Sequence, residues 1–497
     1  MDRLEAAMNI VASPNAEPSE ALLARWASFI LWLSVLGIVF LTFFPFQAFP
    51  VETAVRRVPP FFEWFLGKPS DPPTDFLNVL LFVPFGFGLA AQARRKGWKG
   101  GWPLLGTAVA SFAFSLLIEV LQSYIPDRDT SWQDLVGNTL GGVVGYVLLV
   151  REGGPILQWA SSVLDALRRT ISAPVARTLF FLWLVVGLIL GFTLQRQSRL
   201  TNWDSGVTLT IGGSPAGVRS WNGRVARMEV ADRAISSREL ESADATNLAP
   251  FPRADVVASY PTAGPDVPAA VIPDFMARLL KGSRFTLQMV CTPAADAPPN
   301  NGWILSLSHG AQDVDFVVAQ KGYDLVFFLR TPMTDPADDE PQLIVPDIFR
   351  TSHPVNIAIR YDSAELSVFR NGKILPYGMS LGPGAALLSR ASPLLRHPAP
   401  LRFYDARGYA AFFLCLAFVP LGVVLAFAAS RPERGDSRGM LFLAACVLVP
   451  PVLLEGVLVL ASGRSFHLVN CVVGASILLG SWLVFRLPQR TIDESEA

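Results

Sequence analysis

The stretch ASFILWLSVLGIVFLTFF, residues 27–44, contains no charged residue and is long enough to cross a membrane as a helix. A hydrocarbon core of about 30 Å requires roughly 20 apolar residues in α-helical form. Seven further blocks of the same character lie near residues 76–91, 103–124, 134–150, 178–194, 408–428, 440–461 and 466–485. The sequence therefore predicts a polytopic α-helical membrane protein with about eight spans.

The overall composition favours the same class. Hydrophobic residues make up 51% of the 497 residues and charged residues 16%, against roughly 25% charged residues in soluble domains. The formal net charge is zero, so no nucleic-acid partner is expected. The four cysteines and four histidines are too scattered for a disulfide framework or a metal site. The sequence thus predicts no metal and no cofactor.

Basic residues beside the spans predict their orientation. Arg and Lys clusters follow the second, fourth, sixth and eighth blocks, and all four clusters lie on one side if the amino terminus is cytoplasmic. We therefore expect a multi-pass protein of the cell membrane with both termini cytoplasmic, in which the first block is a signal anchor. Residues 155–171 are too polar to span, and we expect them either along the cytoplasmic interface or in a soluble connecting helix.

The region of residues 195–405 differs in character from the spans. Short alternating runs such as RFTLQMV (284–290) and NIAIRYD (356–362) predict strands, and Asn371-Gly372 predicts a two-residue hairpin turn. We therefore expect an extracytoplasmic all-β sandwich inserted between two sets of spans. The predicted parts are a cytoplasmic segment 1–25, a five-span domain 26–194, the sandwich 195–405 and a three-span domain 406–497.

The runs in this insert resemble the concanavalin A-like, LamG-type jelly roll. WNGRVARMEVADRAISSREL (221–240) is similar to the segment that closes such a domain, and HPVNIAIRYDSAELSVFRNGK (353–373) to one that precedes it, so the order is circularly permuted. The resemblance implies carbohydrate binding, in some members with calcium. The acidic residues available for calcium, which we expect to be ordinary solvated loop charges, are Asp313, Asp315, Asp335, Asp338, Asp339 and Glu340.

Polar residues gather near the outer ends of the second, third and fourth spans. Such groups are costly in a bilayer and are candidates for function, and their spacings of three or four residues place each pair on one helix face. We expect the set to form one pocket, although each residue alone could be an interfacial cap or part of an Arg–carboxylate pair that closes a hairpin. The set comprises Asp75, Asn78, Glu119, Gln122, Arg128, Asp134 and Asn138.

The order and spacing of these residues resemble the VanZ-like family of membrane proteins. The pattern D-x-x-N…P-x-G, then E-x-x-Q…P-x-R…D-x-x-x-N-x-x-G-G, extends over about residues 27–150. The family is named for a contribution to resistance against glycopeptide antibiotics. The resemblance therefore implies a role in the cell envelope, and it implies no particular reaction.

Three functions fit these residues. A binding protein could hold a lipid-linked glycan or an amphiphilic glycopeptide at its outer face, with Arg128 against an anionic head group and the amides against sugar hydroxyls. An enzyme could use Glu119 and Asp134 as an acid/base pair, although the sequence has no nucleophile motif or phosphate loop. A scaffold could display the sandwich and use the polar residues only to join helices. We favour the first, with membrane lipid and a lipid-linked glycan or polysaccharide as expected partners.

The last three spans resemble a degenerate copy of spans two to four. FVPFGFGLA (82–90) recurs as FVPLGVVLA (418–426), and at the same offset Glu119 corresponds to Glu455 and Arg128 to Arg464. After a four-residue deletion Asn138 corresponds to Asn470, while other polar positions of the first copy are apolar in the second. The apolar replacements are Ala411 for Asp75, Leu414 for Asn78, Leu458 for Gln122 and Phe466 for Asp134. Chance similarity between apolar spans is the alternative.

Overall fold

The structure is a computed structural model that describes residues 18–43, 72–122, 131–203, 206–213, 219–260, 272–294, 300–309, 313–334, 342–391, 407–428 and 437–493. The chain divides into two compact units. One unit comprises Met1–Leu184, Cys415–Val449 and Val473–Ala497, and the other comprises Val185–Leu414 and Pro450–Val472. Eight of the described helices are long and apolar enough to cross a membrane. The predicted class, a polytopic helical membrane protein with an inserted β-region, is confirmed.

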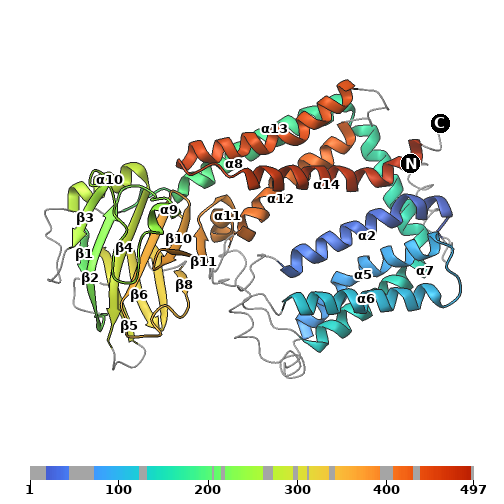
Figure 1. Ribbon diagram of the computed structural model, residues 1–497. Helices are drawn as coiled ribbons and strands as arrows, with labels where there is room; N and C mark the ends of the chain where they lie inside the picture. The colour runs from blue at the N-terminus through green and yellow to red at the C-terminus, as the bar shows by residue number, and fades with distance from the viewer. Residues whose placement is uncertain are drawn as a thin grey trace. The chain divides into compact units, whose positions relative to one another are not determined.

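Four helices make up most of the first unit, and α5 packs against the other three (Figure 1). Their bounds are α2 (Glu20–Phe43), α5 (Pro72–Arg95), α6 (Trp102–Gln122) and α7 (Trp132–Thr170). The contact between α5 and α7 is close because α7 carries glycines there. A Cβ on Gly141 or Gly145 would overlap the carbonyl oxygens of Val79 and Val83, so these small residues allow the two helices to approach closely.

α7 is one helix of 39 residues. The helix of the fourth span therefore continues through residues 155–170, the segment that we expect along the interface or in a connecting helix. The ribbon changes direction along α7 (Figure 1), and Pro155 inside the helix explains the bend because proline removes a backbone hydrogen bond. The predicted span ends near residue 150 because the residues beyond it are polar, but polar residues alone do not end a helix.

The second half of α7 packs on the start of α2. Trp26 Nε1 donates to Ser161 Oγ at 2.8 Å, and Arg25 forms an ion pair with Asp165 at 2.7 Å. Leu157 is fully buried in the same cluster. Ile156 and Leu164 also pack against this cluster, whereas Val163 and Leu167 of the same segment are exposed.

Four further long helices lie in the described part of the chain. They are α8 (Ala173–Gln195), α12 (Arg407–Ala428), α13 (Ser437–Ser462) and α14 (Leu468–Asp493). A short 3-10 turn, η1 (Arg196–Ser198), follows α8. Gly422 of α12 lies against the carbonyl oxygen of Leu478, at 2.5 Å from a Cβ built on the glycine, so α12 and α14 also approach closely at a glycine.

The β-domain consists of two antiparallel sheets (Figure 1). The strand order is β1-β5-β6-β7-β8 in one sheet and β11-β10-β9-β4-β2-β3 in the other. Large aromatic side chains fill the core, including fully buried Phe285, Phe327 and Tyr361. The strands are β1 (Thr208–Ile211), β2 (Gly223–Ala231), β3 (Val256–Tyr260), β4 (Arg284–Pro293), β5 (Asn300–His309), β6 (Asp313–Gly322), β7 (Asp324–Leu329), β8 (Gln342–Val345), β9 (Val355–Asp362), β10 (Glu365–Arg370) and β11 (Lys373–Ser380).

The predicted Asn-Gly hairpin is confirmed. Arg370 pairs with Lys373 across the turn between β10 and β11, and Asn371 and Gly372 have φ of +49° and +78°. A two-residue turn of this type requires positive φ at both positions, which Asn and Gly tolerate best. Three short helices accompany the sheets: α9 (Ser237–Leu240), α10 (Ile272–Gly282) and α11 (Pro383–Ala391).

One of the acidic residues in the β-domain is not where the sequence predicts it. Asp315 lies within β6 with its side chain fully buried and pairs with Arg330 at 3.4 Å, so its interpretation as a solvated loop charge is wrong. Asp313 begins the same strand and is exposed. The remaining four residues, Asp335, Asp338, Asp339 and Glu340, lie outside the described part of the chain.

Candidate functional site

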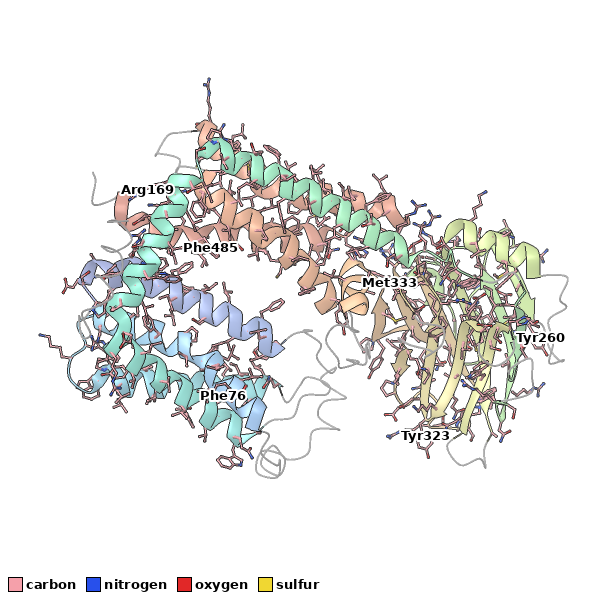
Figure 2. The ribbon with its side chains drawn as sticks, turned by 180° about the vertical axis from the view of Figure 1, so that it is seen from behind. Phe76, Arg169, Tyr260, Tyr323, Met333 and Phe485 are labelled. Atoms are coloured by element: carbon pink, nitrogen blue, oxygen red, sulfur yellow. The ribbon has the colours of Figure 1, made fainter. Side chains whose placement is uncertain are left out.

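Two predicted residues meet where α5 and α7 begin. Asn78 Nδ2 donates to Asp134 Oδ1 at 2.7 Å, and both side chains are half-buried. The side chain of Phe76, two residues before Asn78, is 61% exposed, and Phe76 lies toward the opposite end of this unit from Arg169 of α7 (Figure 2). The Asn78–Asp134 pair is therefore at one end of the helical bundle and accessible from outside it.

Glu119 supports this pair indirectly. Its carboxylate is 1% exposed and accepts the backbone N–H of Ser131 at 3.1 Å. Ser131 is the N-cap of α7, and its Oγ accepts the N–H of Asp134 at 3.1 Å. Serine at this position satisfies a backbone donor that the first helical turn leaves unpaired. Glu119 thus positions Ser131, and Ser131 in turn caps the first turn of α7.

Gln122 and Asn138 make separate contacts. Gln122 Nε2 donates to the carbonyl oxygen of Thr42 at 3.1 Å and so joins the ends of α6 and α2. Asn138 Nδ2 donates to Ser115 Oγ at 2.9 Å, one turn deeper between α6 and α7. Both side chains are buried, so they fit a structural role better than direct contact with a ligand.

The structure accounts for the predicted set only in part. Asp75 lies in the first turn of α5, but its side chain is outside the described part of the protein, and Arg128 lies outside it entirely. Asn78, Asp134 and Glu119 belong to one connected group through Ser131. Among the described residues, no three His, Cys, Asp or Glu side chains are grouped in a way that could hold a metal ion.

A row of hydroxyl residues on α6 was not predicted. Thr107, Ser111 and Ser115 precede Glu119 at intervals of four residues, and all are buried. Ser111 Oγ and Asn138 Oδ1 have no hydrogen-bond partner among the described residues. The four-residue spacing could have predicted this row, because residues four apart share a helix face. Hydroxyl groups are much less costly in a span than charges, so their presence is a weaker indication of a site.

The end of α13, the start of α14 and the turn between them carry a second polar group, in the other unit. Glu455 accepts the backbone N–H of His467 at 2.8 Å, the amide of Asn470 at 3.1 Å and Arg464 Nη2 at 2.7 Å. The Arg464 and Glu455 side chains are 5% and 2% exposed. In both groups a glutamate near the end of a span accepts the N–H of the residue twelve positions further on. This shared contact supports the interpretation of the two segments as related copies.

Comparison with known proteins places the first group within a recognised segment. Residues 29–156 match the family model VanZ/LLP1. Neither the curated proteins nor the solved structures contain a match to the chain. The eight candidate spans and this match together identify the chain as a membrane protein with a VanZ/LLP1-type segment at residues 29–156, the segment that carries the candidate site.

Proposed function

We propose that this is a cell-envelope protein whose first helical unit binds the polar head group of an amphiphile, either a lipid-linked glycan or an amphiphilic glycopeptide. The observation that carries the proposal is the half-buried Asn78–Asp134 pair at one end of the bundle. A carboxylate and an amide offer both acceptors and a donor, which is what sugar hydroxyls require. The match to VanZ/LLP1 supports an envelope role.

The frame around the pair supports binding through preorganisation. Glu119 and Ser131 hold the start of α7, and Gln122 ties α6 to α2. A site whose polar groups are already positioned loses less conformational entropy when a ligand binds. We further propose that the β-domain, by its resemblance to LamG-type domains, binds the carbohydrate portion of an envelope glycan.

A scaffold is the second candidate. Glu119, Gln122 and Asn138 all direct polar atoms to protein partners, which favours a role in joining helices. Under this alternative the Asn78–Asp134 pair is one more interhelical contact. Substitution of the pair would then change stability and leave ligand labelling as it was.

The test uses the full-length protein in lipid nanodiscs and two photoreactive probes, a polyprenyl-diphosphate-linked glycan and a lipidated glycopeptide. Loss of a charge-assisted hydrogen bond costs about 1.5–3 kcal/mol, so Asp134→Ala should reduce labelling by the true ligand class roughly tenfold or more. Glu152→Gln, an exposed change further along the same helix, is the matched control. Equal labelling of Asp134→Ala and the parent by both probes would exclude the proposal.

A further inference from the structure

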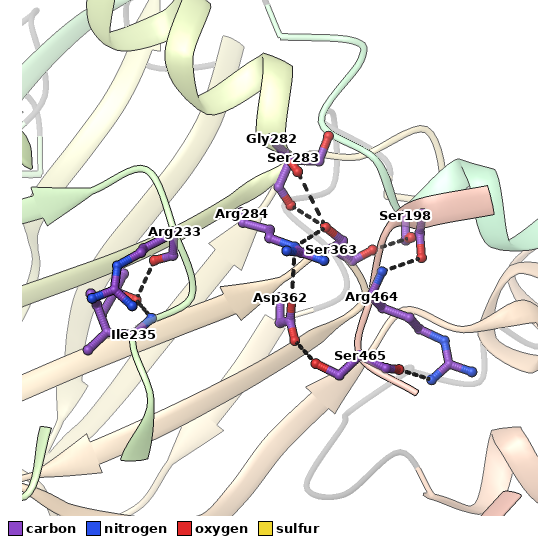
Figure 3. A network of polar contacts seen from close by, with 12 residues as sticks. Ser198, Arg233, Ile235, Gly282, Ser283, Arg284, Asp362, Ser363, Arg464 and Ser465 are labelled. Carbon is purple, nitrogen blue, oxygen red and sulfur yellow. Dashed lines mark hydrogen bonds and ion pairs between the residues drawn. The ribbon is translucent and has the colours of Figure 1, made fainter. Parts of the chain in front are cut away.

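The turn between α13 and α14 is fastened to the β-domain by side chains (Figure 3). Ser465 Oγ donates to Asp362 Oδ2 at 2.5 Å, and Asp362 in turn pairs with Arg284 at 3.0 Å. Two residues after Ser465, His467 Nδ1 lies 3.1 Å from Glu365 Oε1. Both acidic residues lie where β9 ends and β10 begins, so the turn docks at one corner of the sheet.

The end of α8 docks at the same corner. Ser198 Oγ donates to the carbonyl oxygen of Ser363 at 2.5 Å, and Tyr361 donates its hydroxyl to the carbonyl oxygen of Ser198. Gln195 Nε2 also reaches Ser462 Oγ at 3.3 Å. Two helix ends that are distant in the sequence are thereby attached to one β-turn.

The turn itself is held rigidly by Glu455. Its carboxylate binds Arg464, the backbone N–H of His467 and the amide of Asn470, as described above. Arg464 Nη1 also donates to the carbonyl oxygen of Ser465 at 3.1 Å. The backbone of His467 is therefore fixed, and only its ring can change partner.

The ring of His467 has two competing partners at the same nitrogen. Nδ1 is 3.1 Å from Glu365 Oε1 and also 3.1 Å from Arg464 Nη1. With a proton on Nδ1 the ring donates to Glu365, and as an acceptor at Nδ1 it can only receive a hydrogen bond from Arg464. A protonated ring always carries Nδ1–H and donates to Glu365, whereas a neutral ring can carry its proton on Nε2 and accept at Nδ1 from Arg464.

We propose that the α13–α14 turn is a clasp that holds the β-domain, and that deprotonation of His467 weakens the contact between this clasp and Glu365. The charged groups around the ring are Glu365 of β10, Arg464 of the turn and Glu455 of α13. Asp362 and Arg360 of β9 and Arg284 of β4 complete the charged surroundings. The clasp thereby makes attachment of the β-domain depend on pH.

The pKa values of the two partners give the direction of the effect. The hydrogen bond with Glu365 raises the pKa of His467, against the opposing effects of burial and of Arg464. Burial raises the pKa of Glu365. The hydrogen bond with His467 and nearby positive charges together lower this pKa by more than burial raises it, so it lies below its ordinary value. The pair therefore stabilises the clasp below the raised pKa of His467 and above that of Glu365, and the contribution is lost as pH rises through the former.

Hydrogen–deuterium exchange on the full-length protein in nanodiscs tests the clasp. Protection of amides in β10 and in residues 463–470, corrected for intrinsic exchange, should fall about threefold to tenfold between about pH 6 and about pH 8.5. His467→Gln should remove this pH dependence, because it keeps a hydrogen-bonding side chain without a titrating group. His309→Gln is the matched control, since His309 lies at the end of β5, contacts the carbonyl oxygen of Gly206 and has no part in the clasp.

A parent protein with no pH response, or an His467→Gln variant with the parent's response, would overturn the proposal. A second measurement covers failure of that variant to fold. In the parent protein labelled at histidine, NMR titration should give His467 a pKa above the ordinary value for histidine, and Glu365→Gln should lower it. A pKa of His467 that is not raised, or that Glu365→Gln leaves unchanged, would also reject the clasp.

Discussion

Glu119 and Glu455 occupy corresponding places in the two sets of helices and share one contact, the N–H of the residue twelve positions further on. Their surroundings differ. Through Ser131, Glu119 supports the half-buried Asn78–Asp134 pair, whereas Glu455 is buried against Arg464 beside the β-domain. The contact common to both is best explained by folding, so the features specific to the first set are the stronger candidates for function.

The asparagines show how the second set diverged. Asn138 bonds to Ser115, one turn below Glu119, while Asn470 bonds to Glu455 itself. The four-residue deletion inferred from the sequence shifts the asparagine by about one helical turn, which agrees with this difference. In the second set the amide therefore joins the buried ion pair instead of meeting a serine.

The largest effect is expected at the buried ion pair. Glu455→Ala leaves the Arg464 guanidinium buried without its carboxylate, which should lower the free energy of unfolding by about 3–5 kcal/mol. Arg350→Ala is the control, since this exposed pair with Asp347 should contribute less than about 1 kcal/mol. Denaturant unfolding in mixed micelles measures both, and similar costs for the two variants would show that burial of the pair does not matter.

A smaller loss is expected where α7 meets α5. Gly145→Ala places a methyl group against the backbone of Val83 and Phe87, and such overpacking costs about 1–3 kcal/mol. Gly187→Ala on α8 has open space at the same position and should be neutral or stabilising by up to about 1 kcal/mol. Thermal unfolding of the two variants in nanodiscs gives the comparison. A stable Gly145→Ala would contradict the close approach of the helices.

The role of Glu119 as a cap predicts a graded response. Glu119→Ala leaves the buried N–H of Ser131 unpaired and should cost about 1–3 kcal/mol, whereas Glu119→Gln keeps an acceptor and should cost less. Hydrogen exchange at the first turn of α7 reports the local change. If Gln is as damaging as Ala there, the negative charge and not the hydrogen bond is what the helix start requires.

The smallest effect on stability should come from making the first set resemble the second. The double variant Asn78→Leu and Asp134→Phe introduces the residues that stand at the corresponding positions, and we expect stability to change by less than about 1.5 kcal/mol. Photolabelling by the envelope amphiphile should nevertheless fall about tenfold if the pair binds the head group. Loss of folding together with labelling would instead favour the scaffold.

Features governed by local physics were predictable from the sequence. Charge-free blocks of membrane length gave the spans, and Asn371-Gly372 gave the hairpin because few residues tolerate positive φ twice in succession. Asp315 was not predictable, since its burial is accompanied by an ion pair with Arg330, which directly follows the neighbouring strand β7. The Asn78–Asp134 contact was expected only as part of a pocket, because pairing between helices depends on their packing. The Glu455–Arg464 contact could have been predicted, because both residue types are rare in spans and these two lie close in the sequence.

The length of α7 has a mechanical consequence. A membrane crossing uses about 20 residues, and the 39 residues of α7 would extend about 58 Å at the usual rise. One uninterrupted helix therefore connects Asp134, in its first turn, to Asp165, which is tied to Arg25 near its last turn. The start of α2 is thereby joined, along one helix that bends at Pro155, to the opposite end of the bundle where the Asn78–Asp134 pair lies.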